Sequence, residues 1–105
     1  MNILLTTKLP IEGFTTISEH NIIMPEAPKF TPEELTTRLA DADILLSTFD
    51  YKITAEMIAA APNLKLITNF GVGFNNVDIA AARDRGIPVT NTPGLGAAQQ
   101  AFTDI

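Results

Sequence analysis

The sequence predicts one three-layer α/β domain, in which a parallel five-stranded sheet lies between two layers of helices. First, 105 residues suffice for one hydrophobic core but not for two independent domains. Second, the chain is 46% hydrophobic and 18% charged, which is typical of a folded globular protein. Third, short apolar runs alternate with segments of helical periodicity, an order that is typical of right-handed βαβ crossovers.

Five apolar runs are the predicted strands. Their apolar residues are continuous rather than alternating, which is typical of strands that helices cover on both faces. Because helical crossovers join them, these strands favour the flavodoxin-like order 2-1-3-4-5. The runs comprise residues 2–6, 21–24, 44–47, 64–69 and 87–90.

Three predicted helices have clear start signals. Thr31, Pro32 and Glu34 match a capping box with proline at the first helical position, and this helix extends to about Ala40. The second helix contains Met57, Ile58 and Ala61, and the third comprises residues 79–85. Their caps and terminating residues are Thr54 with Pro62, and Asp78 with Gly86.

Two further helices have weaker signals. Ile11, Phe14 and Ile17 lie at helical spacing, although Pro10 and Gly13 disfavour a stable helix there. The last twelve residues also place apolar side chains on one helical face, namely Leu95, Ala98, Phe102 and Ile105. We therefore divide the chain into a domain of residues 1–93 and a helical C-terminal tail of residues 94–105.

The charge balance and the absence of cysteine restrict the partners and the compartment. Twelve acidic and seven basic residues give a net charge of -5, which disfavours nucleic acid and anionic membrane surfaces. No apolar stretch approaches the roughly 20 residues that span a bilayer, and no signal peptide precedes the first strand. Without cysteine the chain needs no oxidising compartment, so a cytoplasmic location is expected.

Ligands of open parallel sheets gather beyond the carboxyl ends of the strands, where loop amides and helix N-termini converge. The loops at that edge comprise residues 7–10, 25–30, 48–52, 70–76 and 91–93. His20 is the only histidine, and it precedes the second strand at the opposite edge. We expect it to be a surface residue without a catalytic role.

The glycine-containing loop after the fourth strand is the strongest candidate for a binding site. Gly71 and Gly73 flank Val72, and glycine lets a ligand approach the main chain closely. Successive amides in such a turn can form a concave site for an anion, so a small carboxylate is a candidate ligand. The same glycines also suit a tight strand-to-helix connection without any ligand.

Two glycine pairs partly match a dinucleotide fingerprint, and neither completes it. Asn76 occupies the third glycine position after Gly71 and Gly73, and Gln99 occupies it after Gly94 and Gly96. We therefore expect no cofactor to be bound by this chain alone.

The run LKLITNFGVGFNNVDIAAARDRGIPVTNTP, residues 64–93, resembles the substrate-binding domain of NAD(P)-dependent D-2-hydroxyacid dehydrogenases, especially the glyoxylate and hydroxypyruvate reductase branch. The resemblance implies that main-chain amides of Val72 and Gly73, beside Gly71, hold the substrate carboxylate. It implies that Phe49 shapes the side-chain pocket, with Tyr51 a weaker candidate. For both aromatic residues, packing at the rim of a loop is an equally good interpretation.

The resemblance further implies a hinge at Thr92 and Pro93, where family members continue into a nucleotide-binding domain. That domain supplies the catalytic arginine, glutamate and histidine and binds NAD or NADP. The tail from Gly94 departs from the family pattern. We therefore expect a substrate-side domain for a 2-oxo or 2-hydroxy acid that is inactive alone, or else an excised or engineered structural fragment. Surface left by a missing domain favours a homodimer.

Two other classes of protein share this fold. Asp50 lies after the third strand, where phospho-receiver domains carry their phosphoacceptor, but Thr6, Thr7 and Lys8 replace the acidic pair that would hold Mg²⁺. A flavodoxin-type module needs a phosphate loop after the first strand, for which Lys8-Leu9-Pro10 is a poor substitute. Both classes are weaker candidates than the dehydrogenase domain.

Overall fold

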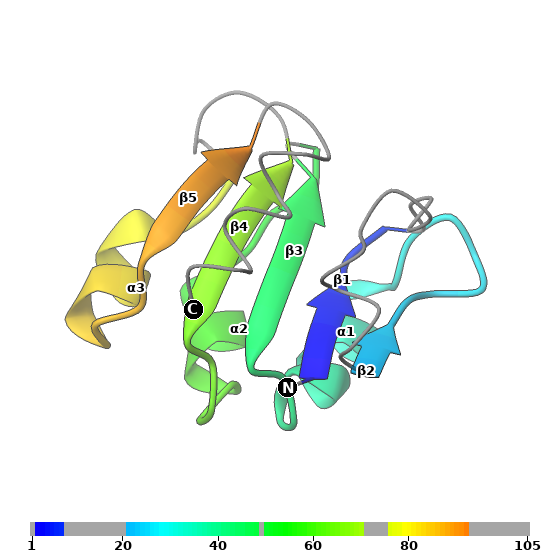
Figure 1. Cartoon of the computed structure of the whole chain (residues 1–105), viewed down its shortest axis with the longest axis horizontal. Helices are drawn as coiled ribbons and strands as arrows, with labels where there is room; N and C mark the ends of the chain where they lie inside the picture. The colour runs from blue at the N-terminus through cyan, green and yellow to red at the C-terminus, as the bar shows by residue number, and fades with distance from the viewer. Residues whose placement is uncertain (1, 8–20, 49, 71–75, 93–105) are drawn as a thin grey trace.

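The computed structural model describes residues 2–7, 21–48, 50–70 and 76–92, and these form a five-stranded parallel sheet (Figure 1). The strand order is β2-β1-β3-β4-β5, as predicted. All four neighbouring pairs are parallel, as the predicted βαβ crossovers require. The strands are β1 (Asn2–Leu5), β2 (Asn21–Ile23), β3 (Ile44–Thr48), β4 (Leu66–Phe70) and β5 (Val89–Thr92).

Three helices lie together on one face of the sheet (Figure 1), with α2 next to both α1 and α3. They are α1 (Pro32–Leu39), α2 (Ala55–Ala59) and α3 (Ile79–Asp84). The predicted caps are confirmed. Thr31 and Glu34 form the reciprocal capping box. The side chains of Thr54 and Asp78 accept hydrogen bonds from the amides of Met57 and Ala81.

The hydrophobic core lies between this helical layer and the sheet. Leu4, Leu45 and Ile67 from three adjacent strands pack in one cluster with side chains of all three helices, such as Leu35, Ile58 and Ala82. The alternate strand residues face away from these helices and are also buried, among them Ile3, Leu46 and Leu66. Burial on both faces explains the continuous apolar runs of the sequence. The helices predicted over residues 11–18 and 94–105 lie outside the described residues.

The fifth strand begins two residues later than predicted, because the preceding residues close the end of α3. The amides of Gly86 and Ile87 donate to the carbonyls of Arg83 and Ala82, both at 2.9 Å, and Gly86 has φ +69°. This is the glycine-terminated helix end that the sequence predicts. Pro88 has no amide hydrogen, so the strand starts at Val89.

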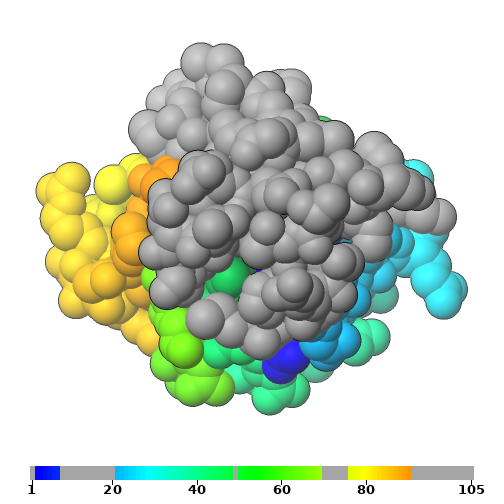
Figure 2. All heavy atoms as spheres, in the orientation of Figure 1, coloured from blue at the N-terminus to red at the C-terminus, as the bar shows by residue number. Residues whose placement is uncertain are grey.

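Different segments lie at the two edges of the sheet (Figure 2). The α3 and β5 segments, coloured yellow and orange, lie at one side of the molecule, and the segment after β2, coloured cyan, lies at the other. Within the part of the chain that the structure describes, no helix is long and apolar enough to cross a membrane.

Candidate functional site

The candidate site lies at the carboxyl ends of β1, β3 and β4, where polar side chains replace the apolar residues of the sheet. Thr6, Ser47, Thr48 and Asn69 are all buried there. The Thr7 hydroxyl lies 3.0 Å from the Thr48 hydroxyl, which links the end of β1 to the end of β3. Sheet strands that become polar at their carboxyl ends are the expected frame of a binding site in this architecture.

The side chain of Asn76 lies at the centre of this polar network. Its amide nitrogen donates to the carbonyl oxygens of Thr48 at 3.1 Å and Tyr51 at 2.9 Å. The side-chain amides of Asn76 and Asn69 also bind each other reciprocally, at 2.9 and 3.1 Å. Asn76 therefore joins the segment after β3 to the end of β4.

Asn69 is held from a second side by β3. Its side-chain oxygen accepts a hydrogen bond from the Ser47 hydroxyl at 3.0 Å, and neither residue is exposed to solvent. Ser47 and Asn69 are also paired across the β3–β4 ladder. Burying these polar groups costs little free energy because they bind each other, and the paired groups fix one arrangement of the strand ends.

Main-chain hydrogen bonds reinforce the same connection. The Ile53 amide donates to the Asn76 carbonyl at 2.7 Å, and the Asp78 amide donates to the Ile53 carbonyl at 3.0 Å. These two bonds make a short parallel bridge between Ile53 and Val77. The start of α3 is thus attached to the segment after β3 both by main chain and by the Asn76 side chain.

Tyr51 is buried in the core, with 7% of its surface exposed. Its hydroxyl donates a hydrogen bond to the Phe30 carbonyl at 2.8 Å. Burial, and to a lesser degree the charge of Glu34, raises the pKa of the Tyr51 hydroxyl above its usual value. Tyr51 thus packs in the core rather than at the rim of a loop.

Asp50 forms an ion pair with Lys29, from the loop that follows β2. The hydrogen bond from the Lys29 ammonium, followed by one with Thr48, lowers the pKa of the Asp50 carboxyl. Both side chains of the pair are 43% exposed, so the pair lies at the rim of the site. A phosphoacceptor at Asp50 would need acidic neighbours after β1, where Thr6 and Thr7 offer hydroxyl groups instead.

Of the other site residues predicted from the sequence, Thr92 alone is among the described residues. Phe49, Gly71, Val72, Gly73 and Pro93 lie outside the described residues. Thr92 is the last residue of β5, opposite Phe70 on β4.

Ser47 and Asn69 are not among the predicted site residues, and Asn76 is predicted only as the last residue of the loop at the carboxyl edge of the sheet. The feature of the sequence that could have identified these residues is their polarity at or just after the ends of apolar strands.

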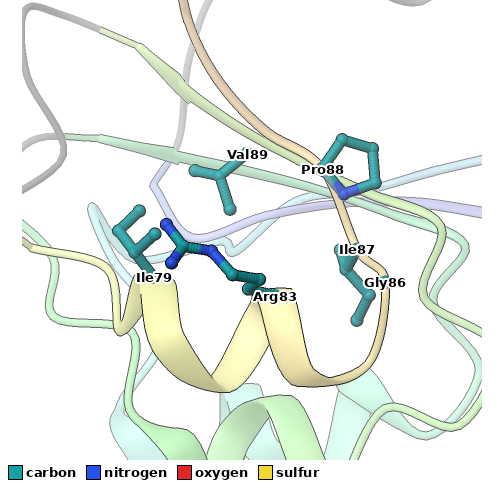
Figure 3. A pocket seen from close by; sticks show the side chains of 6 residues that line it. All are labelled: Ile79, Arg83, Gly86, Ile87, Pro88 and Val89. Atoms are coloured by element: carbon teal, nitrogen blue, oxygen red, sulfur yellow. The ribbon is translucent and has the colours of Figure 1, made fainter.

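A shallow pocket of about 550 Å³ lies elsewhere, between α3 and the start of β5 (Figure 3). Figure 3 shows Ile79 and Arg83 on α3 facing Val89. Because Val89 begins β5, this pocket lies away from the carboxyl ends of the strands. Among the described residues, no three histidine, aspartate or glutamate side chains gather into a metal site.

Hydrogen bonds hold the residues on either side of the segment 71–75. Asn69 precedes this segment and Asn76 follows it, and their side chains bind each other. The position of the third fingerprint glycine is filled by the Asn76 side chain, where a dinucleotide fold needs glycine for close helix packing. The Asn76 side chain is thus engaged with Asn69 at the position where a dinucleotide fingerprint has its third glycine.

Comparison with known proteins gives consistent matches over nearly the whole chain. A family model described as D-isomer specific 2-hydroxyacid dehydrogenase, catalytic domain, matches residues 3–101. The glyoxylate reductase of Thermofilum pendens is 41% identical over 93 residues, which cover 86% of this chain and 27% of that protein. The chain thus spans about a quarter of the length of that relative.

Solved structures agree with these matches. An NAD⁺-bound 3-phosphoglycerate dehydrogenase from Entamoeba histolytica is similar with a TM-score of 0.77 and 33% identity, over 89% of this chain and 33% of that one. An NAD-dependent formate dehydrogenase from Staphylococcus aureus in complex with NAD is similar with a TM-score of 0.72 and 30% identity. That match covers 99% of this chain and 37% of the other.

Proposed function

Because the chain belongs to the D-isomer specific 2-hydroxyacid dehydrogenase family, we propose that it forms the substrate-binding side of such an enzyme and holds a small 2-oxo or 2-hydroxy carboxylate. The observation that carries this proposal is the anchoring of segment 71–75 by Asn69 and Asn76. A loop fixed at both ends can keep its amides oriented for an anion without a large ordering cost on binding.

Within this segment, the amides of Val72 and Gly73 bind the substrate carboxylate, and Gly71 lets the ligand approach the main chain. Phe49 contacts the substituent on C2 and limits its size. The Tyr51 side chain lies in the core, where its hydroxyl is already bound to the Phe30 carbonyl. Thr92 and Pro93 act as the hinge to the rest of the enzyme.

The redox chemistry of the parent reaction belongs to a nicotinamide cofactor, NAD or NADP, which carries the hydride. The residues of this chain do not fit that cofactor, since Asn76 fills the position where a dinucleotide fingerprint has its third glycine. We assign cofactor binding, and the arginine, glutamate and histidine of the reaction, to a nucleotide-binding domain. The chain should therefore bind substrate weakly and not oxidise NADH by itself.

A titration by two-dimensional ¹H–¹⁵N NMR tests the substrate site. Glycolate should shift the amide signals of Gly71, Val72 and Gly73 in a saturable way at millimolar concentration, because few contacts hold so small a ligand. Glycolamide is the matched control ligand, as it keeps the size and hydroxyl of glycolate but lacks the carboxylate. Equal shifts with both ligands, or none with glycolate, would contradict a carboxylate site.

An NADH-oxidation assay tests the division of labour. The chain alone should give no turnover with glyoxylate, whereas adding the separately made nucleotide-binding domain of a glyoxylate reductase relative should give measurable turnover. Turnover by the chain alone would refute the assignment of catalysis to another domain. If the NMR titration and the mixture are both silent, the chain is a structural fragment without a substrate site.

A further inference from the structure

We propose that the pocket between α3 and the start of β5 is a second ligand site, which binds a monocarboxylic acid with an apolar tail. The pocket lies at the end of the strands opposite to the candidate substrate site. None of the residues that form it belongs to segment 71–75 or to the polar network around Asn76. This inference therefore does not depend on the proposed function.

The walls of this pocket are mainly aliphatic (Figure 3). Ile87 is buried, while Ile79 on α3 and Val89 at the start of β5 are half-buried. The volume of about 550 Å³ lies within the range of about 300–1,000 Å³ that is typical of pockets for small ligands. An apolar tail that covers these side chains would remove their surface from water, which is favourable.

Arg83 is the only charged side chain among the described residues that line the pocket. Figure 3 shows it extending from α3 toward Val89, with Ile79 beside its guanidinium. Within the described part of the chain this guanidinium has no hydrogen bond, and the only ion pair joins Lys29 to Asp50. A guanidinium presents two parallel N–H groups that match a carboxylate. The charge of the pocket therefore favours an anion.

Arg83 differs in this respect from Arg85. The Arg85 guanidinium already donates to carbonyl oxygens at the end of α2, those of Ile58 and Ala61. Arg83 lies in the last turn of α3, where the helix dipole stabilises a cation. That effect does not depend on the direction of the side chain, so it does not explain why Arg83 lies across an aliphatic pocket. A ligand carboxylate would supply the partner that the guanidinium lacks.

The edge of the sheet adds main-chain groups to the pocket. β5 is the last strand of the described sheet and pairs there with β4 alone. The Ile67 amide donates to the Pro88 carbonyl at 3.0 Å, and Ile67 is the partner of Val89 in the ladder. Main-chain groups of successive residues point to opposite sides of a strand, so those of Val89 point away from β4. The Val89 amide can therefore donate to the carboxylate as well.

An NMR titration of the full chain with isocaproate, a branched aliphatic acid, tests this site. The amide signals of Ile79, Arg83, Ile87 and Val89 should shift in a saturable way at millimolar concentration, because an open pocket makes few contacts. Isocaproamide keeps the tail without the charge, and acetate keeps the carboxylate without the tail. Each should bind at least about fivefold more weakly than isocaproate.

Two matched variants test the role of the guanidinium. Arg83→Gln should raise the isocaproate dissociation constant at least about fivefold and leave the melting temperature unchanged, because Arg83 has no partner to lose. Arg38 has the corresponding place in the last turn of α1 and lines a different pocket. Arg38→Gln should therefore leave isocaproate binding unchanged. The comparison of ligands uses the wild-type chain, so it does not depend on the folding of a variant.

Three results would overturn the proposal. Isocaproamide that binds as tightly as isocaproate, or an Arg83→Gln variant with wild-type affinity, would show that the pocket does not recognise a carboxylate. Shifts confined to Gly71, Val72 and Gly73 would assign isocaproate to the substrate site, so that the proposed function would stand without a second site. Broadening of the Val89 signal that grows with protein concentration, without ligand, would show that a second copy of the chain occupies this edge.

Discussion

Replacement of Tyr51 by phenylalanine should destabilise the protein without weakening the binding of a carboxylate. The structure places the Tyr51 ring in the core and its hydroxyl 2.8 Å from the Phe30 carbonyl, which is buried as well. Tyr51→Phe keeps the ring and removes only the donor. The ligand role that the sequence left open predicts the reverse pattern, namely weaker binding with little change in stability.

The expected loss follows from the hydrogen bond and the carbonyl that it leaves behind. A typical intramolecular hydrogen bond contributes about 1 kcal/mol, and a buried acceptor left unsatisfied costs roughly 1–3 kcal/mol. We expect Tyr51→Phe to lower the free energy of unfolding by about 1–2 kcal/mol. Tyr51→Ala, which also removes the ring, should lower it by about 3–5 kcal/mol, as for other large aromatic residues in cores.

Urea unfolding followed by far-UV circular dichroism measures the free energy of unfolding of both variants. The slope of this free energy against urea concentration should stay that of the wild type. Tyr51 is the only tyrosine and the chain has no tryptophan, so tyrosinate absorbance reports this hydroxyl alone. Its raised pKa should appear as ionisation above pH 10.0, the usual value. Because the folded pKa is raised, this contribution to stability is complete below the unfolded pKa and is lost as pH rises through the folded pKa.

Two results would refute this reasoning. A Tyr51→Phe variant as stable as the wild type would show that the hydrogen bond to Phe30 contributes nothing. A large increase in the glycolate dissociation constant at unchanged stability would show that the hydroxyl contacts the ligand.

Three further predictions concern the helix ends, the rim and the oligomeric state. Arg85→Ala should lower the free energy of unfolding, measured in urea, by about 1–2 kcal/mol. Arg85→Lys should restore only part of this loss, because one ammonium cannot replace the planar guanidinium on three carbonyls. Equal stability of Arg85→Lys and the wild type would contradict this reasoning. Lys29→Met should raise the pKa of Asp50 toward its usual 3.8, measured by carboxyl ¹³C shifts. The lowered folded pKa contributes stability above the unfolded pKa that is lost as pH falls through the folded one, and at this exposed rim it amounts to less than about 1 kcal/mol. Light scattering at high concentration should detect a homodimer if apolar surface drives self-association, and a monomer alone would remove that prediction.

The fold and the helix starts could be predicted because their signals are local or follow from general rules of chirality. The cap at Thr31 acts over three residues, so the pattern in the sequence contains both partners. The strand order followed from alternating apolar and helical segments. The predicted start of β5 was wrong because an apolar residue, Ile87, closes the helix end before the strand begins.

The network of the candidate site could not be predicted in the same way. Asn76 binds the carbonyls of Thr48 and Tyr51, which are 28 and 25 residues away in the sequence. Nothing local distinguishes such an asparagine from one in an ordinary turn, and Arg85 bound to the carbonyls that follow α2 is a similar case. The proposed carboxylate role of Val72 rests on the family resemblance, whereas the pairing of the Asn69 and Asn76 side chains is found only in the three-dimensional arrangement.

The parallel pairing of the sheet has a consequence for the folding pathway. Ile44 pairs with Leu66 and Ile67 pairs with Val89, so each of these contacts closes a loop of 22 residues, whereas Ile3 pairs with Ile44 across 41 residues. Each doubling of loop length adds about 0.6 kcal/mol to the entropy of closure. We therefore expect β3, β4 and β5 to assemble in the folding transition state, and β1, which pairs with β2 across only 19 residues, to join them afterwards together with β2. Shortened core side chains in β4 should then slow folding, with high φ-values, and those in β1 should mainly accelerate unfolding; high φ-values confined to β1 would reverse this order.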